Sequence, residues 1–152
     1  MIDENLVINK LEAETNYEVL DCLSNLLYEN GYVKESYKQA VKDREKDFPT
    51  GLLIEDGFGI AIPHADREHV NRIGMAVATL DDPVIFNQMG GEAEDKVPVS
   101  LVCMLAIDDP KQHMDTLANL MELFSDHDML EQIKNCSDKE KIMKLLSFTD
   151  RQ

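Results

Sequence analysis

Apolar residues in the first third of the chain recur at the three- and four-residue spacing that is typical of amphipathic helices. Thr15-x-x-Glu18, the pattern of a helix capping box, precedes the first such stretch, and Gly31 follows it as a stop signal. A second helical pattern covers about residues 36–46. We therefore predict two helices, with apolar faces formed by Val19, Leu20, Leu23, Leu26 and Leu27 and by Tyr37, Ala40 and Val41.

The middle of the chain instead carries short continuous apolar runs, a pattern that favours strands entering a core. These runs fall at residues 6–8, 52–54, 58–62, 73–80, 84–86 and 97–107. The last run is the most apolar, so it predicts a central strand that is buried on both faces. Asp81-Asp82-Pro83 is expected to end the strand at 73–80, and residues 88–95 are expected to form a loop.

Helical spacing returns after residue 107. Asp109 followed by Pro110 is a typical helix start, and it opens an apolar stripe of Met114, Leu117, Leu120, Met121 and Phe124. A short helix is predicted at about residues 128–134, and a second capping box, Ser137-x-x-Glu140, opens a last helix. This order of elements predicts an α/β fold with a single mixed β-sheet flanked by helices on both faces. We expect residues 1–152 to form one domain.

The composition narrows the class of partner and the compartment. Thirty acidic and 15 basic residues give a formal net charge of −15, which argues against nucleic acid and is compatible with a basic protein surface. No apolar run approaches the roughly 20 residues that span a bilayer, and the N-terminus lacks a secretory signal pattern. The three cysteines, Cys22, Cys103 and Cys136, form no disulfide framework, so we expect a cytoplasmic location.

The clearest chemical signal lies where the run at 58–62 ends. Pro63 cannot donate to a sheet ladder, and the next residue is His64, an imidazole held at a strand end. His113 lies in the first turn of the helix predicted after the most apolar strand. If the two strands lie side by side, both imidazoles face one space beside a helix N-terminus. That setting suits a phosphoryl group, although each histidine taken alone is also compatible with a plain surface position.

A metal site is the alternative reading of the same stretch. His64-x-Asp66-x-x-His69 offers three ligands in six residues, which would fit a metal-dependent hydrolase. The segment has a loop pattern, however, and no helical HExxH motif places two ligands on one face. The chain also has neither a glycine-rich phosphate loop followed by Lys-Ser/Thr nor a G-x-S-x-G elbow, so neither a nucleotide-using kinase nor a serine hydrolase is supported.

Three features together resemble the fructose–mannitol class of enzyme IIA domains of the bacterial sugar phosphotransferase system. They are the segment from Gly59 to His64, the upstream Arg44-Glu45, and the downstream Pro110-x-x-His113-x-x-x-Leu117. The resemblance covers nearly the whole chain, and the turn at residues 48–51 is most like the galactitol-type branch. It implies a phosphocarrier that takes a phosphoryl group from HPr and passes it to a cysteine of the IIB component. The membrane IIC component is then an indirect partner.

The resemblance also implies roles for individual residues. His64 matches the nucleophile, His113 the second histidine, and Arg44 and Thr50 are expected to stabilise the phosphoryl group. It implies no metal and no cofactor. The guanidinium of Arg44 would offer fixed donors to the three oxygens, because its planar fork matches a phosphoryl group. Asp66 would repel a phosphorylated His64 unless its carboxylate is turned away.

Two alternatives stay open at this point. Arg44 could instead form a structural ion pair with Glu45 or Asp47 at a helix end. The chain could also be a regulatory module, phosphorylated in the same way, whose phosphorylated state switches contacts with other proteins.

Overall fold

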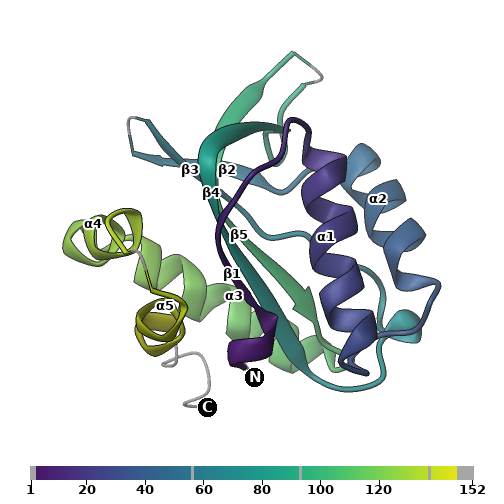
Figure 1. Cartoon of the computed structure of the whole chain (residues 1–152). Helices are drawn as coiled ribbons and strands as arrows, with labels where there is room; N and C mark the ends of the chain where they lie inside the picture. Colours follow the sequence, from purple (N-terminus) through teal and green to yellow (C-terminus); the bar gives the residue numbers. More distant parts are fainter. Residues whose placement is uncertain (1–2, 56, 93, 137, 147–152) are drawn as a thin grey trace.

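The computed structural model describes residues 3–55, 57–92, 94–136 and 138–146, and these are organised around a mixed five-stranded β-sheet (Figure 1). The strand order is β1-β4-β5-β3-β2. β1 pairs in parallel with β4, β3 pairs in parallel with β5, and the other two pairings are antiparallel. The strands are β1 (Val7–Leu11), β2 (Gly51–Glu55), β3 (Phe58–Ala61), β4 (Gly74–Asn87) and β5 (Lys96–Ala106).

Helices cover both faces of this sheet, as predicted (Figure 1). Two helices, α1 (Asn16–Glu29) and α2 (Tyr37–Asp47), pack on one face. On the other face lie α3 (Pro110–Phe124), α4 (His127–Lys134) and α5 (Lys139–Leu146). Alternate residues of β5 enter the two cores, so this central strand is buried on both faces, as its continuous apolar run predicts.

The ends of α1 follow the local signals in the sequence. The Thr15 side chain accepts a hydrogen bond from the Glu18 N–H at 3.3 Å, and Gly31 has a φ of 81° just beyond the helix. The Glu18 carboxylate accepts from the Glu14 N–H at 2.7 Å, one residue before the position that a capping box prescribes. The predicted second capping serine, Ser137, lies outside the described residues.

The prediction that a strand ends at Asp81-Asp82-Pro83 is wrong. β4 continues through these exposed residues to Asn87, and the segment predicted at 84–86 is its second half. The register between β4 and β5 shifts between Thr79 and Val84. Pro83 therefore lies in an irregular stretch where its missing N–H removes no hydrogen bond to β5.

The predicted apolar stripe of α3 is also partly wrong. Met114 and Met121 are 71% and 39% exposed, and the buried residues of the helix are Thr116, Leu120, Leu123 and Phe124. The helix is thus rotated relative to the predicted stripe, because contact with the sheet decides which face is buried.

No described helix combines the length and the apolar character needed to cross a membrane.

Candidate functional site

His64 and His113 come from neighbouring ends of two parallel strands. Beyond the end of β3, the backbone of His64 still pairs with Leu105 of β5, and the Leu105 N–H donates to the Pro63 carbonyl at 2.9 Å. The buried hydroxyl of Tyr37, from α2, donates to the Leu105 carbonyl at 2.6 Å. These contacts fix the backbone that carries His64. Helix α3 begins shortly after β5 ends, which places His113 in its first turn.

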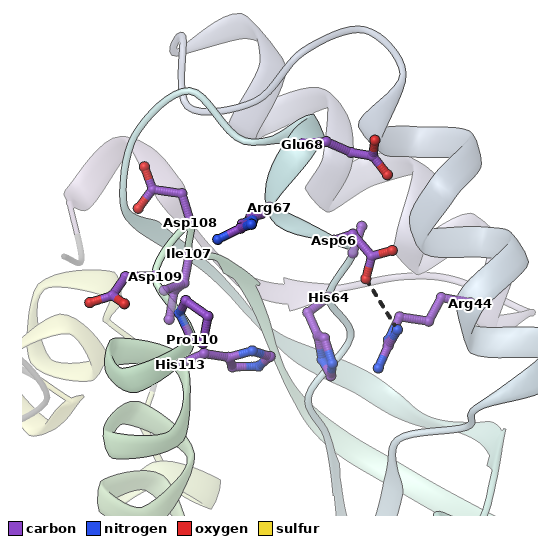
Figure 2. Close-up of a pocket in the computed structure, with 11 residues that line it drawn as sticks. Arg44, His64, Asp66, Arg67, Glu68, Ile107, Asp108, Asp109, Pro110 and His113 are labelled. Carbon is purple, nitrogen blue, oxygen red and sulfur yellow. Dashed lines mark hydrogen bonds and ion pairs between the residues drawn. The ribbon is translucent and has the colours of Figure 1, made fainter.

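The two imidazoles line one pocket and lie edge to face (Figure 2). Their ring centroids are 4.5 Å apart, and the ring planes make an angle of 77°. The pocket has a volume of about 600 Å³. It is lined by Arg44, His64, Ala65, Asp66, Arg67, Glu68, Ile107, Asp108, Asp109, Pro110 and His113. The structure thus brings together three of the four predicted site residues, His64, His113 and Arg44.

A backbone contact sets the tautomer of His64. Nδ1 lies 3.0 Å from the Ile62 carbonyl oxygen, which can only accept, so Nδ1 carries the hydrogen. The lone pair of the neutral ring is therefore on Nε2. Burial lowers the pKa of His64 and the neighbouring His113 and Arg44 add to this effect, whereas Ile62 and Asp66 oppose it; the resulting pKa is about 4. At neutral pH this imidazole is uncharged and offers Nε2 as a nucleophile.

His113 and Arg44 each contribute a polar nitrogen that lacks a partner. Nε2 of His113 and Nε of Arg44 are buried and make no hydrogen bond within the described part of the chain. Burial lowers the pKa of His113, and the positive charge of Arg44 adds to this effect. Both side chains line the pocket, and the positive charge of Arg44 makes the pocket suited to an anion.

The guanidinium of Arg44 turns toward Asp66 (Figure 2). Its Nη1 lies 3.4 Å from the Asp66 Oδ1, and the two side chains are 36% and 71% exposed. The alternative prediction of an ion pair with Glu45 or Asp47 does not match this contact. The carboxylate of Asp66 points at Arg44 rather than at His64, which reduces its repulsion of a phosphoryl group on that histidine.

Thr50, the fourth predicted site residue, lies elsewhere. It is 3% exposed and does not line the pocket. Its hydroxyl donates to the Glu45 Oε1 at 2.8 Å and accepts from the Ile62 N–H at 3.2 Å. The predicted contact between Thr50 and a phosphoryl group does not fit this placement, because the hydroxyl is buried and both of its roles are already taken.

The proposed metal ligands do not meet. Nδ1 of His69 is 2.8 Å from the Ser36 hydroxyl at the start of α2, and Asp66 is paired with Arg44. Among the described residues, potential ligand atoms converge in another place, where Glu55, His127 and Glu131 lie within 4.8 Å of one another. The structure therefore gives no support to a metal site formed by His64, Asp66 and His69.

One side chain that lines the pocket has no signal in the sequence. Arg67, from the short 3₁₀ helix η2 (Arg67–His69), lines it together with Arg44 and brings a second guanidinium (Figure 2). Asp109 caps α3, as predicted, by accepting a hydrogen bond from the Lys111 N–H at 3.3 Å, so one of the N–H groups expected to face an anion is already bonded. Arg67 lies in a polar loop with no spacing signal, and only the fold turns it to this site.

Comparison with known proteins adds the family to this geometry. The family described as "Phosphoenolpyruvate-dependent sugar phosphotransferase system, EIIA 2" matches residues 1–148. The chain is 33% identical to the transcriptional regulator ManR of Bacillus subtilis over 149 residues, which are 95% of this chain and 20% of the regulator. It is 32% identical to the galactitol-specific EIIA component of Escherichia coli K12 over 114 residues, 75% of this chain and 74% of that component.

A solved structure shows the same fold. It is the complex of the mannitol enzyme IIA with phosphorylated enzyme IIB from Escherichia coli, and it superimposes with a TM-score of 0.78. The sequence identity is 24%, and the superposition covers 97% of this chain and 99% of that one.

Proposed function

Because the chain belongs to the EIIA 2 family of the phosphoenolpyruvate-dependent sugar phosphotransferase system, we propose that it carries a phosphoryl group on Nε2 of His64. Family membership makes it a phosphotransferase component; the residue and the atom are the proposal. The observation that carries it is the bond from Nδ1 to the Ile62 carbonyl, which leaves the Nε2 lone pair free in the pocket.

The proposed reaction is a transfer between nitrogens. The Nε2 lone pair attacks the phosphorus of a phosphohistidine on HPr, the P–N bond of the donor breaks, and the electron pair returns to the donor imidazole. The ring of His64 then carries a positive charge, and the Ile62 carbonyl stabilises it through the Nδ1–H. Phosphoryl transfer passes through a loose transition state, so positioning and charge stabilisation supply most of the catalysis.

Arg44 and His113 are the proposed partners of the transferred oxygens. Both side chains line the pocket with His64, and one nitrogen of each makes no hydrogen bond to another described residue. Arginine and neutral imidazole donate hydrogen bonds in fixed directions, which suits a group whose charge is spread over three oxygens. We propose that Asp66 keeps the Arg44 guanidinium in place until the phosphoryl group arrives.

The proposed acceptor is the cysteine of a IIB component, with the membrane IIC component as an indirect partner. The cysteine thiolate would attack the phosphorus, and the Nε2 of His64 would regain its lone pair. The complex of the similar mannitol enzyme IIA with phosphorylated enzyme IIB supports this choice of partner. The 32% identity to a galactitol-specific component supports galactitol or a related polyol as the sugar of the system.

The test is the intact mass of the protein after incubation with phosphoenolpyruvate, enzyme I and HPr. We expect the parent to gain one acid-labile phosphoryl group and His64→Ala to gain none. His127→Ala is the matched control, because His127 is an exposed histidine of α4 that does not line the pocket. Equal phosphorylation of the parent and His64→Ala would refute the assignment of His64.

A regulatory module is the second candidate, and the similarity to ManR favours it. The match covers nearly all of this chain but only 20% of the regulator, so the regulator's own activity belongs to a much longer protein. Transfer onward separates the two functions. Mixing the phosphorylated protein with a galactitol-type IIB component should phosphorylate the IIB cysteine if the chain serves transport, whereas a purely regulatory module would retain its phosphoryl group.

A further inference from the structure

A buried chain of hydrogen bonds links α2 to the backbone that carries His64. Glu45, which is 3% exposed, accepts from the Thr50 N–H and from the Thr50 hydroxyl, each at 2.8 Å. The same hydroxyl accepts from the Ile62 N–H at 3.2 Å. The carbonyl of Ile62 in turn accepts from Nδ1 of His64 at 3.0 Å. Ile62 therefore lies between a buried carboxylate and the imidazole.

The end of the sheet ladder explains why these hydrogen bonds are needed to hold Ile62. The last backbone pair between β2 and β3 is Gly51 with Ala61, so Ile62 lies one residue beyond the ladder. Thr50 is the residue before Gly51, and its hydroxyl oxygen takes the place of the missing carbonyl acceptor. Pro63 has no N–H, so the peptide that carries the Ile62 carbonyl has no donor with which to anchor itself. The bond from the Leu105 N–H to the Pro63 carbonyl holds the backbone after Ile62, and the Thr50 hydroxyl holds the N–H of Ile62 itself.

Glu45 in turn depends on Thr50. A buried carboxylate without donors is costly, and both of its oxygens here are bonded to the backbone and side chain of that one residue. Glu45 follows Arg44 on α2, so the same helix end that anchors Thr50 also brings a guanidinium to the pocket. The two neighbours on the helix thus serve opposite sides of one site.

We propose that Glu45 and Thr50 are positioning residues for His64. Their hydrogen bonds hold Ile62 so that its carbonyl accepts from Nδ1, and this keeps Nε2 as the nitrogen with the lone pair. The inference rests on the proposed function, because it assigns a consequence for phosphoryl transfer to the tautomer of His64. It replaces the direct contact with the phosphoryl group that the resemblance implies for Thr50.

The test compares Thr50→Val with Thr50→Ser. Valine keeps the shape of threonine but has no hydroxyl, whereas serine keeps a group that both donates and accepts. The control is Thr79→Val in β4, away from the pocket. Thr79 is also buried, and its hydroxyl likewise accepts from a backbone N–H, that of Lys10, and donates to a side-chain oxygen, that of Asn9, both at 2.7 Å.

Two quantities are measured for each variant. Long-range ¹H–¹⁵N spectra of the imidazoles report the tautomer of His64, and rapid-quench mass analysis reports the rate of phosphoryl acceptance from HPr. We expect Thr50→Val to populate the Nε2–H tautomer and to slow acceptance roughly ten- to hundred-fold, as a misplaced reacting group does. Thr50→Ser should restore the Nδ1–H tautomer, and Thr79→Val should lose stability without changing either quantity.

A purely structural role gives a different result. If Thr50→Val lowers the melting temperature but keeps the Nδ1–H tautomer and the parent rate, the proposal is overturned. Should Thr50→Val not fold, Glu45→Gln tests the same chain, because its amide presents a donor to Thr50 where a carboxylate oxygen accepted. We expect a change of tautomer in the same direction, and an unchanged tautomer would overturn the proposal. If the parent accepts no phosphoryl group, the proposed function fails, while the tautomer still tests the positioning.

Discussion

At the scale of single residues, the surroundings of each imidazole decide what it can do. Burial lowers the pKa of His64, and its Nδ1 donates a hydrogen bond to the Ile62 carbonyl. His127 is exposed, and its hydrogen bond to Glu55 at 2.8 Å raises its pKa. His69 bonds to Ser36 at the start of α2. One residue type therefore supplies a candidate nucleophile, an exposed ion-pair partner and a structural contact in the same protein.

His113 gives a prediction at this scale. His113→Ala should slow phosphoryl acceptance by roughly ten- to hundred-fold, because a hydrogen bond to a charged group contributes about 1–3 kcal/mol. The measurement is the rate at which the phosphorylated mass appears after rapid mixing with phosphorylated HPr. His127→Ala is the control and should react at the parent rate. Full-rate acceptance by His113→Ala would remove His113 from the mechanism.

At the scale of elements, the site depends on how closely β3 and β5 approach each other. Gly59 of β3 lies against the backbone of β5, where an added Cβ would collide with the Pro98 carbonyl and lie 2.6 Å from a methyl group of Val97. The parallel pairing of these strands brings His64 beside Leu105, and the start of α3 then delivers His113. A shift between the two strands would therefore separate the two imidazoles.

Gly59→Ala is the corresponding test. It should lower the free energy of unfolding by about 3 kcal/mol, because overpacking against a backbone carbonyl and a buried valine forces the strands apart. Gly57→Ala is the matched control. The Cβ at Gly57 meets open space, and its φ of 76° costs an alanine only about 1 kcal/mol. Urea unfolding compares the variants, and equal losses would contradict the close approach of β3 to β5.

At the scale of the whole molecule, the half-buried His64 and the buried Glu45 make the free energy of unfolding depend on pH in opposite directions. The pKa of His64 is lowered to about 4, so between pH 6.5 and 4 only the unfolded chain binds this proton, and stability falls as pH falls. Burial raises the pKa of Glu45 to about 7, against the lowering effects of Thr50 and Arg44. Its contribution to stability is present at low pH and is lost as pH rises through about 7.

Replacing His64 should therefore remove its contribution to the pH dependence of the unfolding free energy. On going from pH 7 to pH 5, His64→Gln should gain about 2 kcal/mol of unfolding free energy relative to the parent. His127→Gln is the control, and its change in unfolding free energy relative to the parent should have the opposite sign. The pKa of His127 is raised, so the parent gains stability from it on acidification and this variant falls behind. Urea unfolding at the two pH values measures both differences, and parallel pH curves for the parent and His64→Gln would contradict the lowered pKa of His64.

The sequence by itself determined the features that local physics controls. The helical spacing around Leu20 and Leu23, the cap at Thr15 and the continuous apolar run of β5 specify elements because each depends on neighbours along the chain. The strand-Pro-His pattern likewise identifies His64 as a candidate site residue, because it depends only on neighbours along the chain. From these features follow the α/β class, the mixed sheet and the approximate place of the site.

Only the tertiary structure decided the rest. Pro83 is tolerated inside β4 because a shift of register with β5 spares its missing N–H, and the exposure of Met114 depends on how α3 meets the sheet. The carbonyl of Ile62, two residues away, decides which nitrogen of His64 keeps its lone pair. The hydrogen bonds of Thr50 to Glu45 and Ile62 decide the role of Thr50. Spacing along the chain cannot specify these features, because each depends on the direction of a hydrogen bond or the rotation of an element once the chain has folded.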